Sequence, residues 1–312
     1  MKKIFFKLLI SLSSLVFILA AIELFLRLFQ LSPNYIIKYE WHEYRKNIIN
    51  SLGFRDIEHT IQKPDNTFRI MFVGDSFTEA WGVPFEKGFP QILTNMLNQS
   101  ARNKHYEPII CAKWGHNTKE ELRTYKTKCA QFNPDLIIIG YVLNDAEGEK
   151  TSKERKEFLY SLRIKKPKGI LLKAYNHLAI YRFFHLRKEY IRIRTAWIKG
   201  YDKIYSGSQS LLQTQQALIE FKRIADANNQ KLVVALLPTL DYELNDNNPF
   251  IKYYKIMLNF LRQNGINACY VYPYFNGKNT IELQVNPGYD SHPNEEGHRI
   301  IAKAIYECLQ LF

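Results

Sequence analysis

Ser76 follows directly on an apolar run, in a stretch over residues 69–82 with the sequence RIMFVGDSFTEAWG. Residues 70–73 are continuously apolar, as in parallel strands that are covered on both faces. Gly74 permits a tight exit from such a strand. We therefore expect Ser76 at the carboxyl end of a strand, where open α/β sheets place their chemistry. The alternative interpretation of this turn is a serine that only caps the next helix.

A serine hydroxyl is a weak nucleophile until a positioned base accepts its proton, and a carboxylate that orients the base assists it. Asp290 and His292 supply these two groups near the C-terminus, in what we predict to be a loop just before the final helix. His298 is a competing base, but it falls within the predicted last helix, where we expect a structural role. The sequence thus predicts Ser76 as nucleophile and His292 as base.

Attack on a carbonyl carbon also needs donors directed at the developing oxyanion. Gly115 and Asn144 both follow apolar runs that we predict to be strands. Gly115 has no side chain, so its N–H can approach a substrate closely, while Asn144 can present a side-chain amide. We expect Asp75 to shape its turn by local hydrogen bonds rather than to act in catalysis.

In these four blocks the chain resembles the SGNH (GDSL-like) hydrolase family, whose namesake Ser, Gly, Asn and His map in order onto Ser76, Gly115, Asn144 and His292. The resemblance extends from about residue 50 to the C-terminus and includes the lead-in sequence GFRD at residues 53–56. It implies a triad of Ser76, His292 and Asp290. It also implies an oxyanion hole made by the N–H groups of Ser76 and Gly115 and the amide of Asn144, with no metal or organic cofactor.

Two features depart from the family pattern. Only Ser291 separates Asp290 from His292, whereas many members have two residues at this point. The fourth block is often a compact Gly-x-Asn-Asp, but here Gly140 stands four residues before Asn144, so we assign Gly140 to the strand. We interpret Asn144 and Asp145 as the functional pair.

Asp145 is predicted to contact substrate, and so is Asn117, which follows the Gly115 block. For Asn117 the sequence allows a second interpretation, because an Asn in front of a helical pattern is also a common N-cap.

Strands and helices are predicted to alternate along the chain. Strand-like runs cover residues 70–73, 108–112, 136–142, 232–237 and 268–272, and helical patterns cover residues 89–98, 119–131, 211–228, 251–263 and 295–311. This alternation predicts an α/β fold with a five-stranded parallel sheet between two helical layers. The family resemblance adds a flavodoxin-like strand order.

The N-terminus carries an export signal of some kind. Three lysines precede an apolar run over residues 8–22, and the apolar pattern continues past Glu23. A cleaved signal peptide and an uncleaved transmembrane anchor both fit. We favour the signal anchor, because no small-x-small cleavage site follows, and its basic flank then places the rest of the chain outside the cytoplasm.

Positive charge is concentrated between residues 150 and 203, where sixteen Lys or Arg face four acidic residues, giving 16 − 4 = +12 of the net +13. Aromatic residues are interleaved with these charges on what we predict to be two or more helices. The first interpretation is a helical cap on the main domain; the second is a basic platform for anionic lipid or acidic polysaccharide. Nucleic acid would satisfy the same charge, but not for an exported protein.

Cys111, Cys129, Cys269 and Cys308 are widely spread and form no CxxC motif, so the sequence predicts neither a zinc site nor a redox motif. We interpret Cys111 and Cys269, which fall in strand-like runs, as ordinary buried thiols, and a disulfide is the open alternative, for which the sequence offers no support.

Together these observations predict a membrane-anchored, extracytoplasmic serine hydrolase that cleaves an O-acyl ester on a cell-envelope glycan or lipid. An O-acyltransferase of the same fold remains an alternative, and so does a non-catalytic protein that binds glycan or membrane. The expected organisation is an anchor at 1–30, a lead-in at 31–66 and a hydrolase domain at 67–312 that contains the basic insertion at 150–203.

Overall fold

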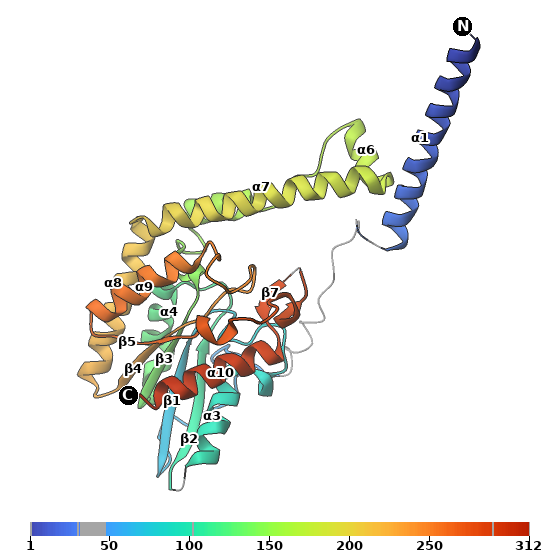
Figure 1. The fold of residues 1–312 in the computed structure, drawn as a ribbon. Helices are drawn as coiled ribbons and strands as arrows, with labels where there is room; N and C mark the ends of the chain where they lie inside the picture. The colour runs from blue at the N-terminus through green and yellow to red at the C-terminus, as the bar shows by residue number, and fades with distance from the viewer. Residues whose placement is uncertain (1, 30, 32–47, 102, 289, 312) are drawn as a thin grey trace. The chain divides into compact units, whose positions relative to one another are not determined.

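The computed structural model describes residues 2–29, 31, 48–101, 103–288 and 290–311. The chain forms two compact units (Figure 1). The smaller unit comprises Met1–Lys38 and Glu157–Gly200, and the larger comprises Tyr39–Lys156 and Tyr201–Phe312.

A five-stranded sheet forms the centre of the larger unit. Its strands are β1 (Thr67–Gly74), β2 (His105–Ala112), β3 (Leu136–Tyr141), β4 (Lys231–Leu236) and β5 (Asn267–Tyr270). All neighbouring pairs are parallel, in the order β2-β1-β3-β4-β5. The predicted five-stranded parallel sheet and the flavodoxin-like strand order are both confirmed.

Helices cover both faces of this sheet, which explains why every residue of β3 is buried. The helices after the five strands are α3 (Phe89–Ser100), α4 (Thr118–Thr124), α8 (Gln209–Ala227), α9 (Ile251–Gln263) and α10 (Glu295–Leu309). α3 and α10 pack against each other on the face turned toward the viewer in Figure 1, whereas α4 packs against α8. The sequence pattern located all five helices, and for α3, α8, α9 and α10 the ends differ from the predicted ones by no more than two residues.

The helix predicted over residues 119–131 is shorter than expected. After α4 the chain continues as a π-helical turn, Tyr125–Cys129, and a 3₁₀ turn, Ala130–Phe132. Asn133 ends it in the left-handed conformation, at φ 46°. The periodicity of apolar residues does not distinguish these tighter and wider turns from an α-helix, which is why the sequence predicted one helix.

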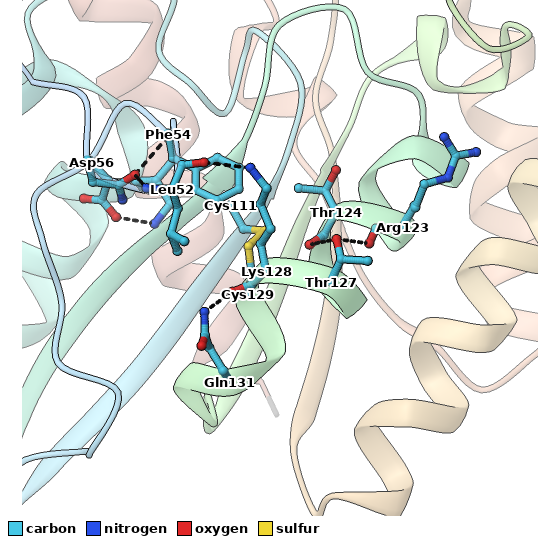
Figure 2. Close-up of a disulfide and its surroundings, with 12 residues drawn as sticks. Leu52, Phe54, Asp56, Cys111, Arg123, Thr124, Thr127, Lys128, Cys129 and Gln131 are labelled. Carbon is cyan, nitrogen blue, oxygen red and sulfur yellow. Dashed lines mark hydrogen bonds between the residues drawn. A yellow bond between two sulfur atoms is a disulfide. The ribbon is translucent and has the colours of Figure 1, made fainter.

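The prediction that Cys111 and Cys269 are ordinary thiols was wrong. Cys111 on β2 is bonded to Cys129, with a Cα–Cα distance of 6.3 Å (Figure 2), and Cys269 on β5 is bonded to Cys308 on α10, at 5.8 Å. Each disulfide joins a sheet strand to a helical segment packed on it. Such pairing depends on tertiary proximity, which a separation of 18 or 39 residues does not reveal.

A small antiparallel hairpin precedes α10. It pairs β6 (Gln284–Asn286) with β7 (Asp290–Pro293). The predicted loop that carries Asp290 and His292 is therefore a strand, which restricts the backbone at both residues.

The smaller unit consists of helices. α1 (Lys2–Leu28) is one continuous helix, and Lys3–Leu28 is long and apolar enough to span a membrane. The basic stretch contributes α5 (Lys153–Ser161), α6 (Ile170–His177) and α7 (Ala179–Tyr205), of which α5 and α7 continue into the larger unit. The prediction of two or more helices in this stretch is confirmed.

The first testable prediction concerns the disulfide Cys111–Cys129. Replacing both cysteines by alanine should lower the free energy of unfolding by about 3 kcal/mol, because an 18-residue separation is no longer closed in the unfolded chain. Urea unfolding of the purified full chain measures this difference. Peptide mapping without reductant should recover Cys111 with Cys129 and Cys269 with Cys308, and any other pairing would contradict the structure.

Candidate functional site

The turn after β1 is shaped by two glycines on neighbouring strands. Gly74 of β1 is paired with Gly140 of β3. A Cβ atom added at Gly74 or Gly140 would lie 2.1 or 2.3 Å from Oγ1 of Thr78. Because neither glycine has a side chain, Thr78 can pack onto the ends of β1 and β3. This packing holds the turn that carries Ser76 close to the ends of the two strands. Sequence reasoning placed Gly140 in the strand correctly but missed Thr78.

Arg55 holds the chain that follows this turn. Its side chain is buried, and its guanidinium donates to the carbonyl oxygens of Glu79 (3.0 Å), Ala80 (2.6 Å) and Val83 (2.6 Å). Ala80 has φ 59°, a conformation that alanine rarely adopts without such support. The GFRD lead-in thus acts through structure, by fixing the loop that carries the serine.

Ser76, His292 and Asp290 lie in one chain of hydrogen bonds. Ser76 Oγ is 2.8 Å from His292 Nε2, and His292 Nδ1 is 2.5 Å from Asp290 Oδ1. The same carboxylate oxygen accepts the backbone N–H of His292 at 3.0 Å. A carboxylate on Nδ1 favours the tautomer that carries its proton there, so Nε2 is left as the acceptor that faces the serine hydroxyl.

Aromatic rings surround the imidazole of His292. The ring of Phe77 lies 4.9 Å from it and that of Trp81 lies 5.8 Å from it, between ring centres. Trp81 in turn contacts Trp114 at 6.1 Å, and Trp114 is 44% exposed. The aromatic rings that flank the His292 imidazole therefore extend to a tryptophan that is open to solvent, whereas Ser76 itself is only 9% exposed.

Two backbone N–H groups near the serine are unused. In the described part of the chain, the N–H of Ser76 and that of Gly115 donate to no other protein group. Gly115 has φ +69°, which is strained for any residue with a side chain. Both groups belong to turns that follow strands β1 and β2, as predicted.

Asn144 lies in the 3₁₀ turn after β3, and its amide is held by Asp75. Asn144 Nδ2 donates to Asp75 Oδ2 at 2.7 Å, while Asp75 Oδ1 accepts the N–H of Phe77 at 2.9 Å. Rotating the Asn144 amide by half a turn would place its Oδ1 against Asp75 Oδ2, two oxygens that repel each other. The contact with Asp75 therefore fixes the orientation of this amide. Nδ2 carries a second hydrogen that remains for an oxyanion. Asp75 therefore shapes the turn as expected, and it also orients Asn144.

Lys150 bonds to the peptide that carries the Gly115 N–H. Its Nζ donates to the carbonyl oxygen of Trp114 at 2.5 Å and lies 4.0 Å from the centre of the Trp114 ring. The Trp114 carbonyl and the Gly115 N–H belong to one planar trans peptide and point in opposite directions. Lys150 therefore sets the direction of the Gly115 N–H.

The same loop is held at two further points. Trp114 N–H donates to Glu79 Oε2 at 2.7 Å, and Arg155 Nη1 donates to the Gly115 carbonyl at 3.0 Å. A Cβ at Gly115 would lie 2.5 Å from Lys150 Cε. Sequence reasoning missed Lys150 and Arg155, because both lie in the basic stretch and nothing in the local pattern distinguishes them from its other cations.

The substrate-binding role predicted for Asn117 is not supported by its placement. Asn117 is the N-cap of α4, where its Oδ1 accepts the N–H of Glu120 at 2.9 Å. Its Nδ2 donates to the Glu147 carbonyl at 2.9 Å, and the side chain is buried. The second interpretation, a helix cap, is the correct one.

Asp145 is also buried rather than exposed to a substrate. Its Oδ2 accepts the N–H of Val142 at 2.6 Å, which closes the turn that presents Asn144. Burial, followed by the neighbouring carboxyl of Asp145, raises the pKa of Glu121 well above its ordinary value.

Among the described residues, no group of three or more His, Cys, Asp or Glu side chains is placed to hold a metal ion.

His298 occupies the core, as expected for a structural residue. It is fully buried on α10, its ring stacks on Phe89, and its Nδ1 accepts the Phe89 N–H at 3.2 Å. Burial, together with the nearby His292 and Arg55, lowers the pKa of His298 to about 3. A neutral ring at this depth supports the junction of α3 and α10 and cannot exchange protons with a substrate.

Comparison with known proteins shows similarity in structure only. No known sequence family model matches the chain, and no curated protein matches its sequence. The structure is similar to that of a catalytic mutant of the acetylxylan esterase Axe2 from Geobacillus stearothermophilus, with 13% identity and a TM-score of 0.50 over 78% of this chain and 94% of that one. It is also similar to a protein described as a GDSL-like lipase from Parabacteroides merdae, with 13% identity and a TM-score of 0.49 over 81% and 100%. TesA matches with 14% identity and a TM-score of 0.48 over 78% and 98%. At these identities the likeness concerns the fold alone.

The second prediction follows from the buried His298. Its pKa of about 3 lies below the value of about 6.5 in an unfolded chain, so the unfolded state binds a proton more readily. The stability that neutral His298 contributes is complete above pH ~6.5 and falls as the pH drops toward 3. His298→Asn keeps an acceptor for Phe89 and should reduce the loss of unfolding free energy between about pH 7 and about pH 5 by about 2 kcal/mol.

Urea unfolding at the two pH values provides the measurement, and His105→Asn, at an exposed position, is the matched control. An identical loss in wild type and His298→Asn would show that the buried imidazole does not resist protonation.

Proposed function

We propose, from the SGNH hydrolase fold of the larger unit, that this protein is a membrane-anchored serine esterase acting on O-acyl groups outside the cytoplasm. The hydrogen-bonded chain Ser76–His292–Asp290 carries the proposal. A serine whose only task was to cap a helix would need neither an imidazole at 2.8 Å nor a carboxylate behind it.

In the first half-reaction, Ser76 Oγ attacks the ester carbonyl carbon while His292 Nε2 takes its proton. Asp290 holds the proton on Nδ1 and stabilises the imidazolium that forms. The N–H groups of Ser76 and Gly115 and the amide of Asn144 donate to the tetrahedral oxyanion. As this intermediate collapses, the alcohol leaves with the proton from His292, and the acyl group stays on Ser76.

In the second half-reaction, His292 removes a proton from water, which attacks the acyl-serine. The oxyanion donors serve again, and the carboxylic acid leaves as the proton returns to Ser76. An acyltransferase would share the first half-reaction and would accept a sugar hydroxyl in place of water.

Three observations support an exported protein with an acylated glycan or lipid as substrate. α1 is long and apolar enough to span a membrane, and lysines precede its apolar run. Disulfides such as the two found here form in oxidising compartments. The partly exposed Trp114, whose ring neighbours that of Trp81 next to His292, offers an apolar surface for a sugar ring or an acyl chain.

The third prediction tests the serine mechanism. Ser76→Ala should lower kcat for a short p-nitrophenyl ester by at least about 10³-fold and abolish labelling by a fluorophosphonate. Ser206→Ala, which removes an exposed hydroxyl, should leave both unchanged. A folded Ser76→Ala variant that still hydrolyses the ester at the wild-type rate would exclude the mechanism. Product analysis with an O-acetylated glycan then separates release of acetate from transfer to another sugar.

The fourth prediction tests Lys150 as a positioning residue. Lys150→Met leaves the Trp114 carbonyl without its bond and frees the peptide that carries the Gly115 N–H. We expect kcat to fall about 10- to 100-fold, because one oxyanion donor is no longer aimed, while KM changes little.

Lys150→Arg should recover part of the loss, because it restores a donor at this position, and Lys278→Met serves as a surface control. An increase in KM that parallels the fall in kcat, or no recovery of kcat in Lys150→Arg, would indicate that Lys150 supports the loop only by packing.

A further inference from the structure

The end of the N-terminal helix carries a carboxylate that caps another helix. Glu23 accepts the N–H groups of Ala179 (2.8 Å) and Ile180 (2.9 Å), one with each of its oxygens. These are the first two residues of α7, whose N–H groups have no partner within their own helix. A carboxylate at this position also complements the positive end of the helix dipole.

Arg27 completes the same contact. It donates to Glu23 Oε1 through Nε at 2.8 Å and to the carbonyl of His177, the last residue of α6, at 2.6 Å. Leu26, between them in sequence, is only 6% exposed, whereas the other large apolar residues of α1 are exposed. We call Glu23, Leu26 and Arg27, with residues 177–180, the anchor joint.

The residues that α1 contributes to the anchor joint lie in the last six residues of the candidate membrane helix Lys3–Leu28. The twenty residues from Lys3 to Ile22 measure about 30 Å as an α-helix, which matches the hydrocarbon thickness of a bilayer. Glu23 and Arg27 then fall in the headgroup layer. α6 is only eight residues long and ends at the joint, so it lies within about 12 Å of that layer.

A segment beside the joint combines basic and apolar side chains that are all exposed. It contains Ile164 (54% exposed), Ile170 (81%) and Leu171 (50%). Arg163, Lys165, Lys166 and Lys168 lie among them, and no acidic residue occurs between 163 and 171. We call residues 163–171 the interfacial strip.

The backbone of the interfacial strip is fastened to α7, which leaves its side chains free to face outward. Arg192 donates to the carbonyl of Arg163 at 2.6 Å, and Glu189 accepts the N–H of Lys165 at 2.8 Å. The Lys165 carbonyl lies 2.8 Å from His185 Nε2. Exposed isoleucines and leucines between lysines, on a fixed backbone, match the interface of a bilayer with anionic lipid.

We propose that α1 is retained in the mature protein and that the anchor joint holds the interfacial strip on the surface of an anionic bilayer. A cleaved signal peptide would have no reason to cap a helix 156 residues away. This inference rests on the membrane placement proposed above but not on the chemistry of Ser76. Its consequence is that the interfacial strip, the part of the basic insertion next to the anchor joint, lies on lipid rather than on a polysaccharide.

The experiment uses the full chain reconstituted in phosphatidylcholine vesicles with and without phosphatidylglycerol. The described residues contain no free cysteine, so Ile170→Cys provides a site for an environment-sensitive fluorophore, and Ile219→Cys on α8 is the matched control. We expect blue-shifted emission from position 170 in the anionic vesicles and none from position 219. Water-like emission from position 170 in a reconstituted protein would overturn the proposal for the strip.

Two variants of the Ile170→Cys protein separate the causes. Reversing Lys165, Lys166 and Lys168 to Glu should abolish the shift, whereas reversing Lys104, Lys255 and Lys278, elsewhere on the surface, should not. Glu23→Gln, which removes the charge that caps α7, should reduce the shift while the chain stays in the vesicles. An emission shift at position 170 that persists in both the lysine-reversal variant and Glu23→Gln would overturn the roles proposed for the positive charges and for the anchor joint.

Mass spectrometry of the protein purified from membranes tests retention, and it should recover peptides from residues 8–27. Their absence would overturn the retained anchor. Failure of the full chain to enter vesicles at all would refute the membrane placement itself, while the esterase assay with Ser76→Ala reports on the catalytic proposal independently.

Discussion

Thr78 packs where two strands offer no side chains. A methyl group on Gly74 or Gly140 would lie within 2.3 Å of its hydroxyl, so any larger residue there would push the turn away from the sheet. Ser76, two residues earlier in the same turn, would move with it and lose its 2.8 Å contact with His292. The hydrogen bonds between Ser76, His292 and Asp290 thus depend on the missing side chains of Gly74 and Gly140 in the strands below.

Around this turn, charged side chains serve mainly to fix the backbone. Arg55 binds three carbonyls of the serine loop, Lys150 binds the carbonyl behind the Gly115 N–H, and Asp75 holds the amide of Asn144. None of the three needs to touch a reacting atom to influence the reaction. Oxyanion donors are effective when they are aimed before the charge develops, and in the mechanism we propose these contacts would supply that aim.

The sequence alone predicted the sheet, its five helices and the residues that meet at the strand ends. Apolar runs and helical periods are local signals that a sequence shows directly. Because the carboxyl ends of parallel strands lie at one edge of the sheet, the sequence also predicted that Ser76, Gly115 and Asn144 would be neighbours. The hairpin that carries His292 could not be predicted, because Asp290-Ser291-His292-Pro293 has no alternation of apolar residues. The disulfides and the contacts of Glu23 and Lys150 could not be predicted either, because each joins segments that become neighbours only after folding.

The order in which the chain is made gives the separation of Ser76 and His292 another meaning. Because synthesis runs from the N-terminus, Ser76 leaves the ribosome before His292, which lies 216 positions later in the chain. Over this stretch of synthesis the polypeptide carries the Ser76 hydroxyl without the imidazole that contacts it in the folded chain. The contact between Ser76 and His292 can form only when the hairpin of β6 and β7 has docked beside the sheet, so an esterase of the kind proposed would be inert toward esters until that step.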